Sequence, residues 1–380
     1  MADAVYIHIP FCVKKCHYCD FNSYAYQDQY ISDYLKALEL EMKMTVEQFP
    51  PKKIKTIYIG GGTPTVLNAM EMEYLLSSIS KYFHYMDEQI EFTIEANPGT
   101  LDPEKLKIMA EYGVNRISMG VQGFQDELLS YLGRIHNQKD VYKSIEMARK
   151  FGFSNLSIDL MFGLPKQDIK MLEESLDKAI DLEIPHMSVY GLKIEENTLF
   201  HTLAEKNALP LPTEKIELQM YLLTIEKMKK NGYLHYEISN FAKPGFESMH
   251  NINYWRNGDY YGLGAGAHGY INNVRHENIR GVKQYFKAII EDGKLPKVDE
   301  YLIPLDEKKE DTMMLGLRML SGVKYSEYKT LFGENLLDRF NEQVDKLVAL
   351  GLLVKDEEGV RLSDKGLIYG NEVFAEFISL

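Results

Sequence analysis

The sequence is poor in cysteine and in long apolar runs. Its three cysteines cannot form the disulfide framework of a secreted protein, so we expect a reducing, cytoplasmic setting. No hydrophobic run approaches ~18 residues, and we therefore expect no transmembrane segment. The first residues, Met1–Pro10, contain neither a basic segment nor a long apolar stretch, so we expect no signal or transit peptide.

Positive charge is also scarce. The chain has 43 basic and 56 acidic residues, a net charge of −13 at pH 7. Nucleic acids and anionic membranes attract proteins through positive surfaces, so a general affinity for either is not expected. With 45% hydrophobic and 26% charged residues, the chain has the composition of a folded protein. Its 380 residues suggest two domains, or one barrel with an appendage.

Short runs of β-branched and aromatic residues alternate with helical patterns in the first half of the chain. This alternation predicts right-handed βαβ units around a parallel sheet. We expect an α/β fold, a partial (β/α)6 barrel whose functional site lies at the C-terminal ends of the strands. The predicted strands are Val5–Ile9, Ile54–Ile59, Ile90–Glu95, Arg116–Met119, Asn155–Met161 and His186–Leu192.

The alternation weakens in the second half of the chain, although Thr213–Lys230 has the pattern of a capped helix. A stretch rich in Gly, Asn and Tyr follows and is expected to consist of loops. The last part shows two helices, about Lys308–Leu320 and Asn335–Leu350, before two short strands and a final helix, and so resembles a winged helix. Its acidic residues outnumber its basic ones, which favours a lid facing protein or substrate over a DNA reader. The predicted domains are a barrel over 1–235, a connecting region over 236–305 and a small helical domain over 306–380.

All three cysteines lie in the string Cys12-Val13-Lys14-Lys15-Cys16-His17-Tyr18-Cys19, which follows the first predicted strand. Thiolates are soft ligands that suit iron–sulfur clusters or zinc. Three thiolates around a four-iron cluster leave one iron open for a further ligand. The first alternative is a zinc site with His8 or His17 as fourth ligand, but this chain lacks the second cysteine pair of usual structural zinc sites. The other alternative is a group of inert buried cysteines.

Polar or glycine-rich strings follow the other predicted strands. The glycines at 60–62 let backbone groups approach a small zwitterion, although a tight turn alone would explain two of them. Glu95 and Asp159 can accept from an ammonium group or ribose hydroxyls, and Arg134 can bind a carboxylate through two parallel hydrogen bonds. Gln122 follows the fourth strand. Singly, each residue is more often structural, but together at successive strand ends they predict one site.

The motif C-x₃-C-x-Y-C after the first strand resembles the radical S-adenosylmethionine (SAM) superfamily. The other strings are similar to its oxygen-independent coproporphyrinogen III oxidase family, over nearly the whole chain. The resemblance implies a [4Fe-4S] cluster on Cys12, Cys16 and Cys19, SAM chelated to the open iron, and an electron donor for the cluster. The SAM contacts that it implies are Tyr6, Tyr18, Gly61, Gly62, Thr63, Glu95, Gln122, Arg134 and Asp159.

Two departures from the oxidase pattern point to a particular branch of that family. Phe21 stands where the oxidases carry a fourth cysteine, and the segment before the first strand is shorter than theirs. Both agree with the oxidase-like branch of heme chaperones, HemW, which carries a His-Asn-x-x-Tyr-Trp signature. The resemblance therefore implies a protein that binds heme and passes it to an acceptor protein, with respiratory or membrane-associated proteins among the candidates.

The signature reads His250-Asn251-Ile252-Asn253-Tyr254-Trp255 here. By this resemblance His250, Asn251, Tyr254 and Trp255 would bind heme, with the imidazole as axial ligand and the aromatic rings against the macrocycle. Arg256, Arg275 and Arg280 could meet the propionates. The residues alone favour a hydrogen-bonded loop histidine beside a core tryptophan, and it is the resemblance that favours heme binding.

Two other functional classes stay open at this point. One is a radical enzyme acting on a tetrapyrrole, including a coproporphyrinogen oxidase, and the other is a zinc-stabilised scaffold. The run Gly262–Gly269 could be mistaken for a dinucleotide fingerprint, which requires a strand before it and a helix after it. No clear strand precedes the run in the sequence, so we interpret it as a close-packed backbone element beside the barrel mouth.

Overall fold

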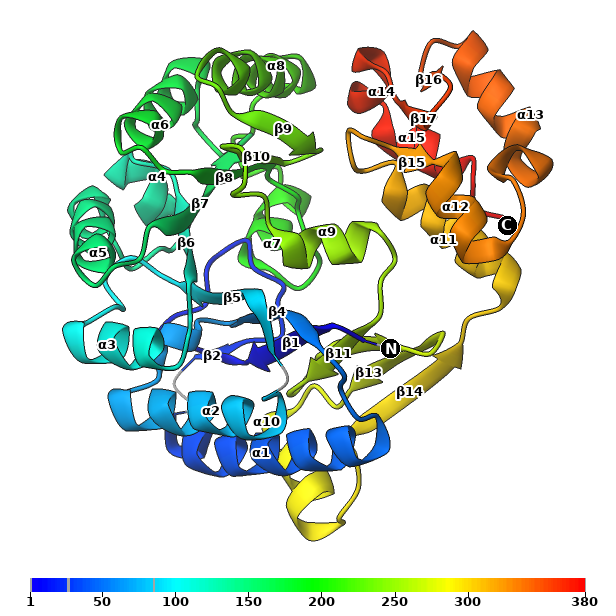
Figure 1. Ribbon diagram of the computed structural model, residues 1–380. Helices are drawn as coiled ribbons and strands as arrows, with labels where there is room; N and C mark the ends of the chain where they lie inside the picture. Colours follow the sequence, from blue (N-terminus) through cyan, green and yellow to red (C-terminus); the bar gives the residue numbers. More distant parts are fainter. Residues whose placement is uncertain (1, 26–27, 85, 380) are drawn as a thin grey trace.

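The computed structural model describes residues 2–25, 28–84 and 86–379. Its largest element is one open, twelve-stranded sheet that curves without closing into a barrel (Figure 1). In spatial order its strands are β14 (Lys297–Leu302), β13 (Val274–Asn278), β12 (His268–Ile271), β11 (Tyr260–Leu263), β1 (Ala4–Ile9), β4 (Ile54–Gly61), β5 (Met86–Ala96), β6 (Arg116–Gln122), β7 (Asn155–Phe162), β8 (His186–Gly191), β10 (Asn240–Ala242) and β9 (Leu234–Glu237).

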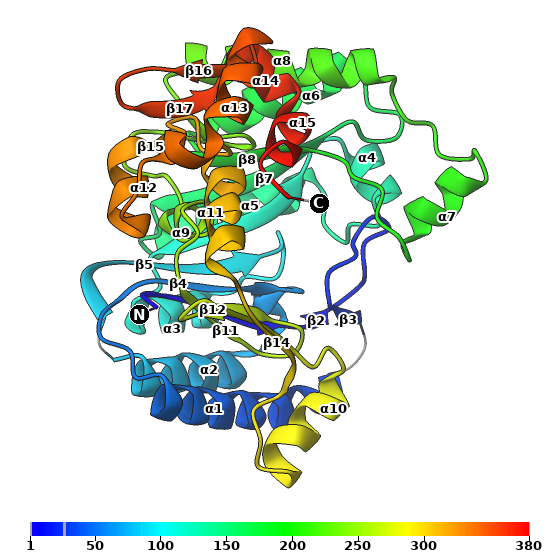
Figure 2. The same cartoon turned by 90° about the vertical axis from the view of Figure 1, so that its right-hand side faces the viewer.

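The six central strands, β1 and β4 to β8, are parallel and match the six predicted strands. The α/β barrel-like fold predicted from the sequence is therefore confirmed, as an open sheet. Helices connect these strands and lie over the outer face of the sheet (Figure 1). They are α1 (Ile31–Gln48), α2 (Ala69–Tyr82), α3 (Pro103–Glu111), α4 (Asp126–Tyr131), α5 (Gln138–Lys150) and α6 (Ile169–Asp181). After β8, α8 (Glu214–Lys230) packs beside α6, whereas the short α7 (Leu199–Glu205) lies next to the cysteine loop (Figure 2).

Local sequence explains where several of these helices begin. Asn68 and Asn137 start α2 and α5 with capping boxes, in which side chain and backbone satisfy each other's hydrogen bonds. Thr213 accepts a hydrogen bond from the backbone N–H of Ile216 and caps α8, as its position in the sequence predicts. No helix in the described part of the chain is long and apolar enough to cross a membrane.

The central strands separate apolar and polar side chains strictly by face. Residues such as Ile57, Phe92 and Ile117 point outward and join the main hydrophobic core beneath the helices. The alternate residues point into the barrel and are mostly polar, because successive side chains of a strand face opposite sides. These inward residues include Tyr6, Thr56, Tyr58, Thr93, Glu95, Arg116, Ser118, Ser157, Asp159, His186 and Ser188. The interior is therefore built for polar ligands rather than as a dry core.

The connecting region differs from the loops that we expected. Strands β11 to β14 extend the sheet beyond β1, and β11 pairs with β1 in parallel. A strand therefore does precede the glycine-rich run, which corrects our interpretation, but another strand and no helix follows it, so the run is no dinucleotide fingerprint. These strands are short and interrupted by turn residues, so their pattern in the sequence is weak.

The glycine-rich run is linked to the cysteine loop by hydrogen bonds. The buried carboxylate of Glu41 accepts hydrogen bonds from Gly264 N–H, at 2.8 Å, and from the Asn278 amide, at 2.6 Å. The Asn22 amide, which belongs to the cysteine loop, donates to the carbonyl of Ala265 at 2.9 Å. Helix α1, the glycine-rich run and the cysteine loop are thus joined by hydrogen bonds.

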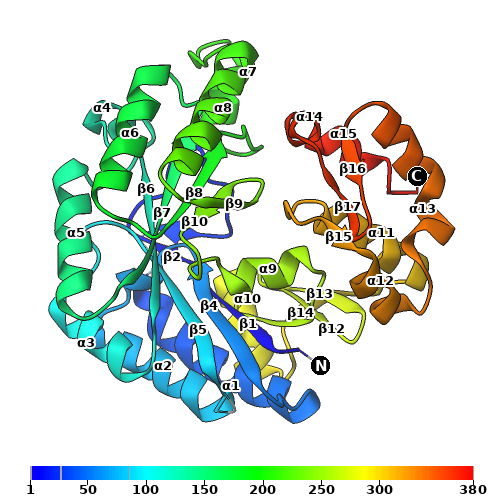
Figure 3. The ribbon, with the colours of Figure 1, turned by 45° about the horizontal axis from the view of Figure 1, so that its top comes forward.

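Residues after β14 form a small domain with its own hydrophobic core (Figures 2 and 3). The two helices, the strand pair and the final helical segment expected from the sequence are present, and β15 and α12 are additional. This domain contains α11 (Leu305–Gly316), β15 (Val323–Lys324), α12 (Tyr325–Phe332), α13 (Leu336–Ala349), β16 (Leu353–Lys355), β17 (Gly359–Leu362), α14 (Asp364–Ile368) and α15 (Gly370–Ala375).

The small domain contacts the barrel near strand β9. Glu237 forms a β-bridge with Met319, and the backbone N–H of Leu320 donates to the carbonyl of Tyr236 at 3.0 Å. Two ion pairs, Arg256–Glu327 and Arg275–Asp311, join the small domain to the segment that precedes it. The domain therefore lies beside the open side of the barrel, as Figure 3 shows.

Candidate functional site

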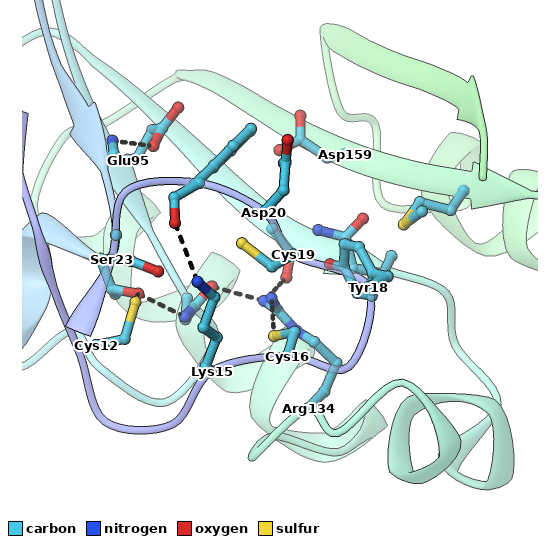
Figure 4. A pocket seen from close by; sticks show the side chains of 18 of the residues that line it. Cys12, Lys15, Cys16, Tyr18, Cys19, Asp20, Ser23, Glu95, Arg134 and Asp159 are labelled. Carbon is cyan, nitrogen blue, oxygen red and sulfur yellow. Dashed lines mark hydrogen bonds between the residues drawn. The ribbon is translucent and has the colours of Figure 1, made fainter. Parts of the chain in front are cut away.

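The three cysteines lie around one pocket at the C-terminal ends of the parallel strands (Figure 4). Cys12 ends the short strand β2 (Phe11–Cys12), which pairs with β3 (Tyr24–Ala25), and Cys16 and Cys19 lie in the loop between these strands. All three thiols are free and half-buried, which does not fit a group of inert core cysteines. The loop is anchored where His17 N–H donates to the carbonyl of Leu132 at 3.0 Å.

A chain of hydrogen bonds connects two of the cysteines across three strand ends. The Cys12 sulfur contacts the Thr63 hydroxyl at 3.7 Å, and the Asn97 amide donates to the same hydroxyl at 2.9 Å. Arg134 donates to Asn97 Oδ1 at 2.5 Å and to the Cys16 sulfur at 3.4 Å. The network holds the cysteine loop against β4 and β5 before any ligand is bound.

Burial controls the charge state of the thiols. It raises the pKa of Cys12, and it raises the pKa of Cys19 to about 11, with like charge on the other thiols adding to the effect. Without a metal these thiols are therefore protonated near neutral pH, and a bound metal would be what stabilises the thiolates. Three soft donors on one loop, open to one pocket, fit an iron–sulfur cluster with a free coordination position.

The histidines near the cysteines are held by other partners. Both ring nitrogens of His8 are engaged, by the Tyr6 hydroxyl and by the carbonyl of Asn22, each at 2.8 Å. His17 Nδ1 lies 2.8 Å from the carbonyl of Tyr131. Within residues 2–25, 28–84 and 86–379, no three His, Cys, Asp or Glu side chains converge as around a single metal ion. The engagement of both ring nitrogens does not favour His8 as the fourth ligand of a zinc site.

Two carboxylates face each other across the pocket. Glu95 accepts from the Tyr58 hydroxyl at 2.7 Å and from Gly61 N–H at 3.1 Å. Burial raises the pKa of Glu95 to about 7, with the charge of Asp159 contributing. Burial also raises the pKa of Asp159 to about 6, although its hydrogen bond with Ser188 opposes the shift. A cation bound between them would favour the ionised forms of both.

The structure brings together most of the residues that the sequence assigns to SAM. The pocket is lined by the three cysteines together with Tyr18, Gly61, Gly62, Thr63, Glu95, Gln122, Arg134 and Asp159. Gly61 has a φ of 112°, and a side chain there would meet the ring of His8 at 2.6 Å, so only glycine fits. Tyr6 lies apart, one inward layer below the pocket, where its hydroxyl binds His8. The ligand roles of all these residues remain predictions.

Several pocket residues were missed by reasoning from the sequence. Asn97 joins Thr63 to Arg134, and Tyr190 donates to Gln122 Oε1 at 3.1 Å. Ser23, Ser118 and Lys193 also line the pocket. Asn97 had a signal in the sequence, since it follows Glu95 at a strand end, and Ser118 alternates with apolar neighbours. Lys193 lies past the last predicted strand, where the sequence gives no signal.

The His-Asn-x-x-Tyr-Trp signature forms helix α9 (Met249–Trp255), which enters the barrel from the opposite end of the strands. Glu91 in the middle of β5 accepts from the backbone N–H groups of Met249 and His250, at 2.9 and 3.0 Å. A carboxylate at a helix N-terminus satisfies free N–H groups and the helix dipole. This contact fixes α9 below the cysteine pocket rather than in it.

His250 is fully enclosed, with 1% of its surface exposed. Its Nδ1 lies 2.9 Å from the Thr56 hydroxyl, and its Nε2 lies 2.8 Å from the Tyr254 hydroxyl. Burial lowers its pKa to about 3, so the imidazole is neutral. Neither nitrogen is free to bind a metal in this conformation, which is the hydrogen-bonded alternative considered above. Axial ligation by His250 requires one of these two contacts to break.

The residues of the signature lie on two different faces of α9. His250 and Tyr254 face the barrel interior, whereas Trp255 packs beside Met319 near the small domain, with the Arg318 guanidinium 4.3 Å from the centre of its ring. Asn251 lies in the first turn, where its N–H contacts the Ser248 cap. The four residues of the signature therefore do not share one face of α9. Each arginine considered for propionates is ion-paired, in Arg256–Glu327, Arg275–Asp311 and Arg280–Glu277.

The fold and the three-cysteine pocket together define a radical SAM protein. The family model for the radical SAM superfamily matches residues 6–179, and the model for the HemN C-terminal domain matches residues 303–369. Heme chaperone HemW of Bacillus subtilis is 46% identical over 99% of both chains, and that of Escherichia coli is 33% identical over 99% of this chain and 98% of its own. This chain belongs to the HemW family.

A solved structure and a more distant relative agree with this assignment. Coproporphyrinogen III oxidase (HemN) from Escherichia coli has the same fold, with a TM-score of 0.85 and 25% identity over 98% of this chain and 89% of that one. The radical S-adenosyl methionine domain-containing protein 1, mitochondrial, of Bos taurus is 29% identical over 99% of this chain and 87% of its own. The resemblance proposed from the sequence is therefore confirmed at the level of the family.

Proposed function

We propose that this protein is a heme chaperone that carries a [4Fe-4S] cluster and SAM and transfers heme to an acceptor protein. The observation that carries the proposal is the convergence of the three cysteines with polar strand ends in one pocket, in a chain similar over its whole length to proteins named heme chaperones. The proposed setting is the cytoplasm. The proposed domains are 1–235, 236–305 and 306–380, with the cluster site in the first and the heme signature in the second.

In this proposal Cys12, Cys16 and Cys19 hold the cluster, and SAM binds its open iron. A reduced cluster supplies an electron that can cleave the sulfonium of SAM. Arg134 is suited to the carboxylate of SAM, and Glu95 and Asp159 are suited to its ammonium group and ribose hydroxyls. Tyr18 and the glycines at 61 and 62 line the space between them. An electron donor is required as a further partner.

The rival function is turnover of a tetrapyrrole, as in coproporphyrinogen oxidase. Phe21, which replaces the fourth cysteine of the oxidases, is 60% exposed at the rim of the pocket. An anaerobic assay with coproporphyrinogen III, reductant and SAM is expected to give no protoporphyrinogen. The same preparation loaded with heme is expected to transfer it to an apo-acceptor, which is followed by the change in the Soret band. Turnover without transfer would instead establish the enzyme.

The affinity for SAM is expected to depend on pH through Glu95. SAM carries positive charge and binds the ionised carboxylate better. Because the pKa of Glu95 in the empty pocket is about 7, the carboxylate is ionised above pH 7 and must lose a proton before binding at lower pH. The Kd is therefore expected to rise about tenfold as pH falls from 7.5 to 6, in calorimetric titrations of cluster-containing protein. Glu95→Gln should bind more weakly and show a shallower pH dependence, because only Asp159, with a pKa of about 6, still titrates in this range. A flat profile in the wild type would remove Glu95 from the site.

A further inference from the structure

Tyr58 lies between the cysteine pocket and the signature helix. Its hydroxyl donates to Glu95 Oε1, on the pocket side, at 2.7 Å. Its ring is stacked against His250 on the other side, with centroids 5.2 Å apart and an angle of 28°. Tyr6 stacks on it as well, at 6.3 Å and 29°, so the ring has little freedom to turn. One side chain therefore contacts both a pocket carboxylate and the signature histidine.

The position of His250 depends on these neighbours. The imidazole is held inward by the Thr56 hydroxyl, the Tyr254 hydroxyl and the face of Tyr58. For His250 to bind an external metal, it must leave this position, and Tyr58 then loses its stacking partner. An inward and a released state of His250 would therefore differ at Tyr58, and the structure shows the inward one.

We propose that Tyr58 is a positioning residue that couples the pocket to His250, so that a cationic ligand bound to Glu95 keeps His250 turned inward. A ligand cation fixes the Glu95 side chain as a carboxylate, and a charged acceptor makes the stronger hydrogen bond with the Tyr58 hydroxyl. The fixed ring of Tyr58 then keeps its contact with His250. This inference rests on the proposed function, in which the ligand is SAM and the released histidine binds heme.

Linkage gives the coupling a measurable form. If SAM favours the inward state, SAM must weaken heme binding, and heme must weaken SAM binding by the same factor. Hemin titrations of cluster-containing wild type are expected to show at least about fivefold weaker binding at saturating SAM, the lower end of typical couplings. Tyr58→Phe keeps the ring contacts with His250 and Tyr6 and loses only the hydrogen bond to Glu95. In this variant the heme Kd values with and without SAM should agree.

Thr56→Val is the matched control. It removes the Thr56 hydroxyl that faces His250 Nδ1 and leaves the hydrogen bond between Tyr58 and Glu95 intact. This variant is expected to change the heme Kd. The ratio of the heme Kd at saturating SAM to the heme Kd without SAM should stay as in the wild type. The inference is overturned if SAM leaves the wild-type heme Kd unchanged or lowers it, or if Tyr58→Phe retains the wild-type ratio.

A second measurement separates this inference from the proposed function. Histidine-ring NMR of protein with an oxidised cluster and no heme is expected to show a SAM-dependent shift of the His250 signal, absent in Tyr58→Phe. If the wild type binds no hemin, the proposed function fails, and this shift alone decides the role of Tyr58. No shift in the wild type, or the same shift in Tyr58→Phe, overturns the coupling.

Discussion

Cys16→Ser is expected to abolish the iron–sulfur cluster. A serine hydroxyl is a hard, weakly acidic ligand that poorly replaces a thiolate on iron, and two cysteines are too few to hold a cubane with one open iron. After anaerobic reconstitution with iron and sulfide, we expect the wild type to contain about four irons per chain and the variant less than one. The broad visible absorbance of the cluster should disappear with the iron, and SAM binding should be lost.

Ser23→Ala is the control for this experiment. Ser23 lines the same pocket and is 6% exposed, and its hydroxyl lies beside the Cys12 thiol. The variant changes the surroundings of the cluster without removing a proposed ligand, so its iron content should match that of the wild type. A Cys16→Ser protein with full iron content would contradict the ligand assignment. One zinc per wild-type chain, with no iron or sulfide, would establish the scaffold alternative instead.

His250→Ala is expected to weaken heme binding at least tenfold and to shift the Soret band. A neutral imidazole is a strong axial ligand for heme iron, and the low pKa of His250 keeps it neutral across the usual pH range. The variant also leaves Thr56 and Tyr254 without their partner, and it should unfold about 2–3 kcal/mol more easily, as is common for a truncated buried group. Urea unfolding and circular dichroism check that the variant is folded under the titration conditions.

His201→Ala provides the comparison, because chains with exposed histidines can bind hemin without specificity. His201 lies on α7, and 34% of its side chain is exposed. It should keep the wild-type affinity and spectrum. An unchanged Soret spectrum and affinity in His250→Ala would reject His250 as the ligand. The buried and hydrogen-bonded His250 would then have a structural role only.

The six parallel strands could be predicted because each alternates apolar and polar residues between turn signals. In β6, for example, Ile117 and Met119 pack under the helices while Arg116 and Ser118 point inward. Strands β11 to β14 escaped prediction because β11 has four residues and its pairing partner, β1, lies more than 250 positions away. The parallel pairing of β11 with β1 is a long-range contact that no local pattern contains.

The same division applies to the site. The cysteines could be assigned because their spacing is local, and the strand-end residues because parallel strands bring their C-terminal ends to one edge. The environment of His250 could not be predicted, because it depends on Thr56 and Tyr58 of β4, almost two hundred residues away in the sequence. The split of the signature between the barrel and the small domain likewise follows from where α9 is anchored by Glu91.

The chemistry available to this protein can be read from its sequence: three neighbouring thiols, a series of polar strand ends and a histidine followed by two aromatic residues. Local spacing sets the thiols and the signature, because residues a few positions apart stay near one another in any fold, and the alternation of strands and helices predicts that the polar strand ends meet. Which of these groups are accessible depends on how distant parts of the chain pack. Packing of distant strands left the cysteine pocket open and enclosed the imidazole of His250 between partners from β4 and α9.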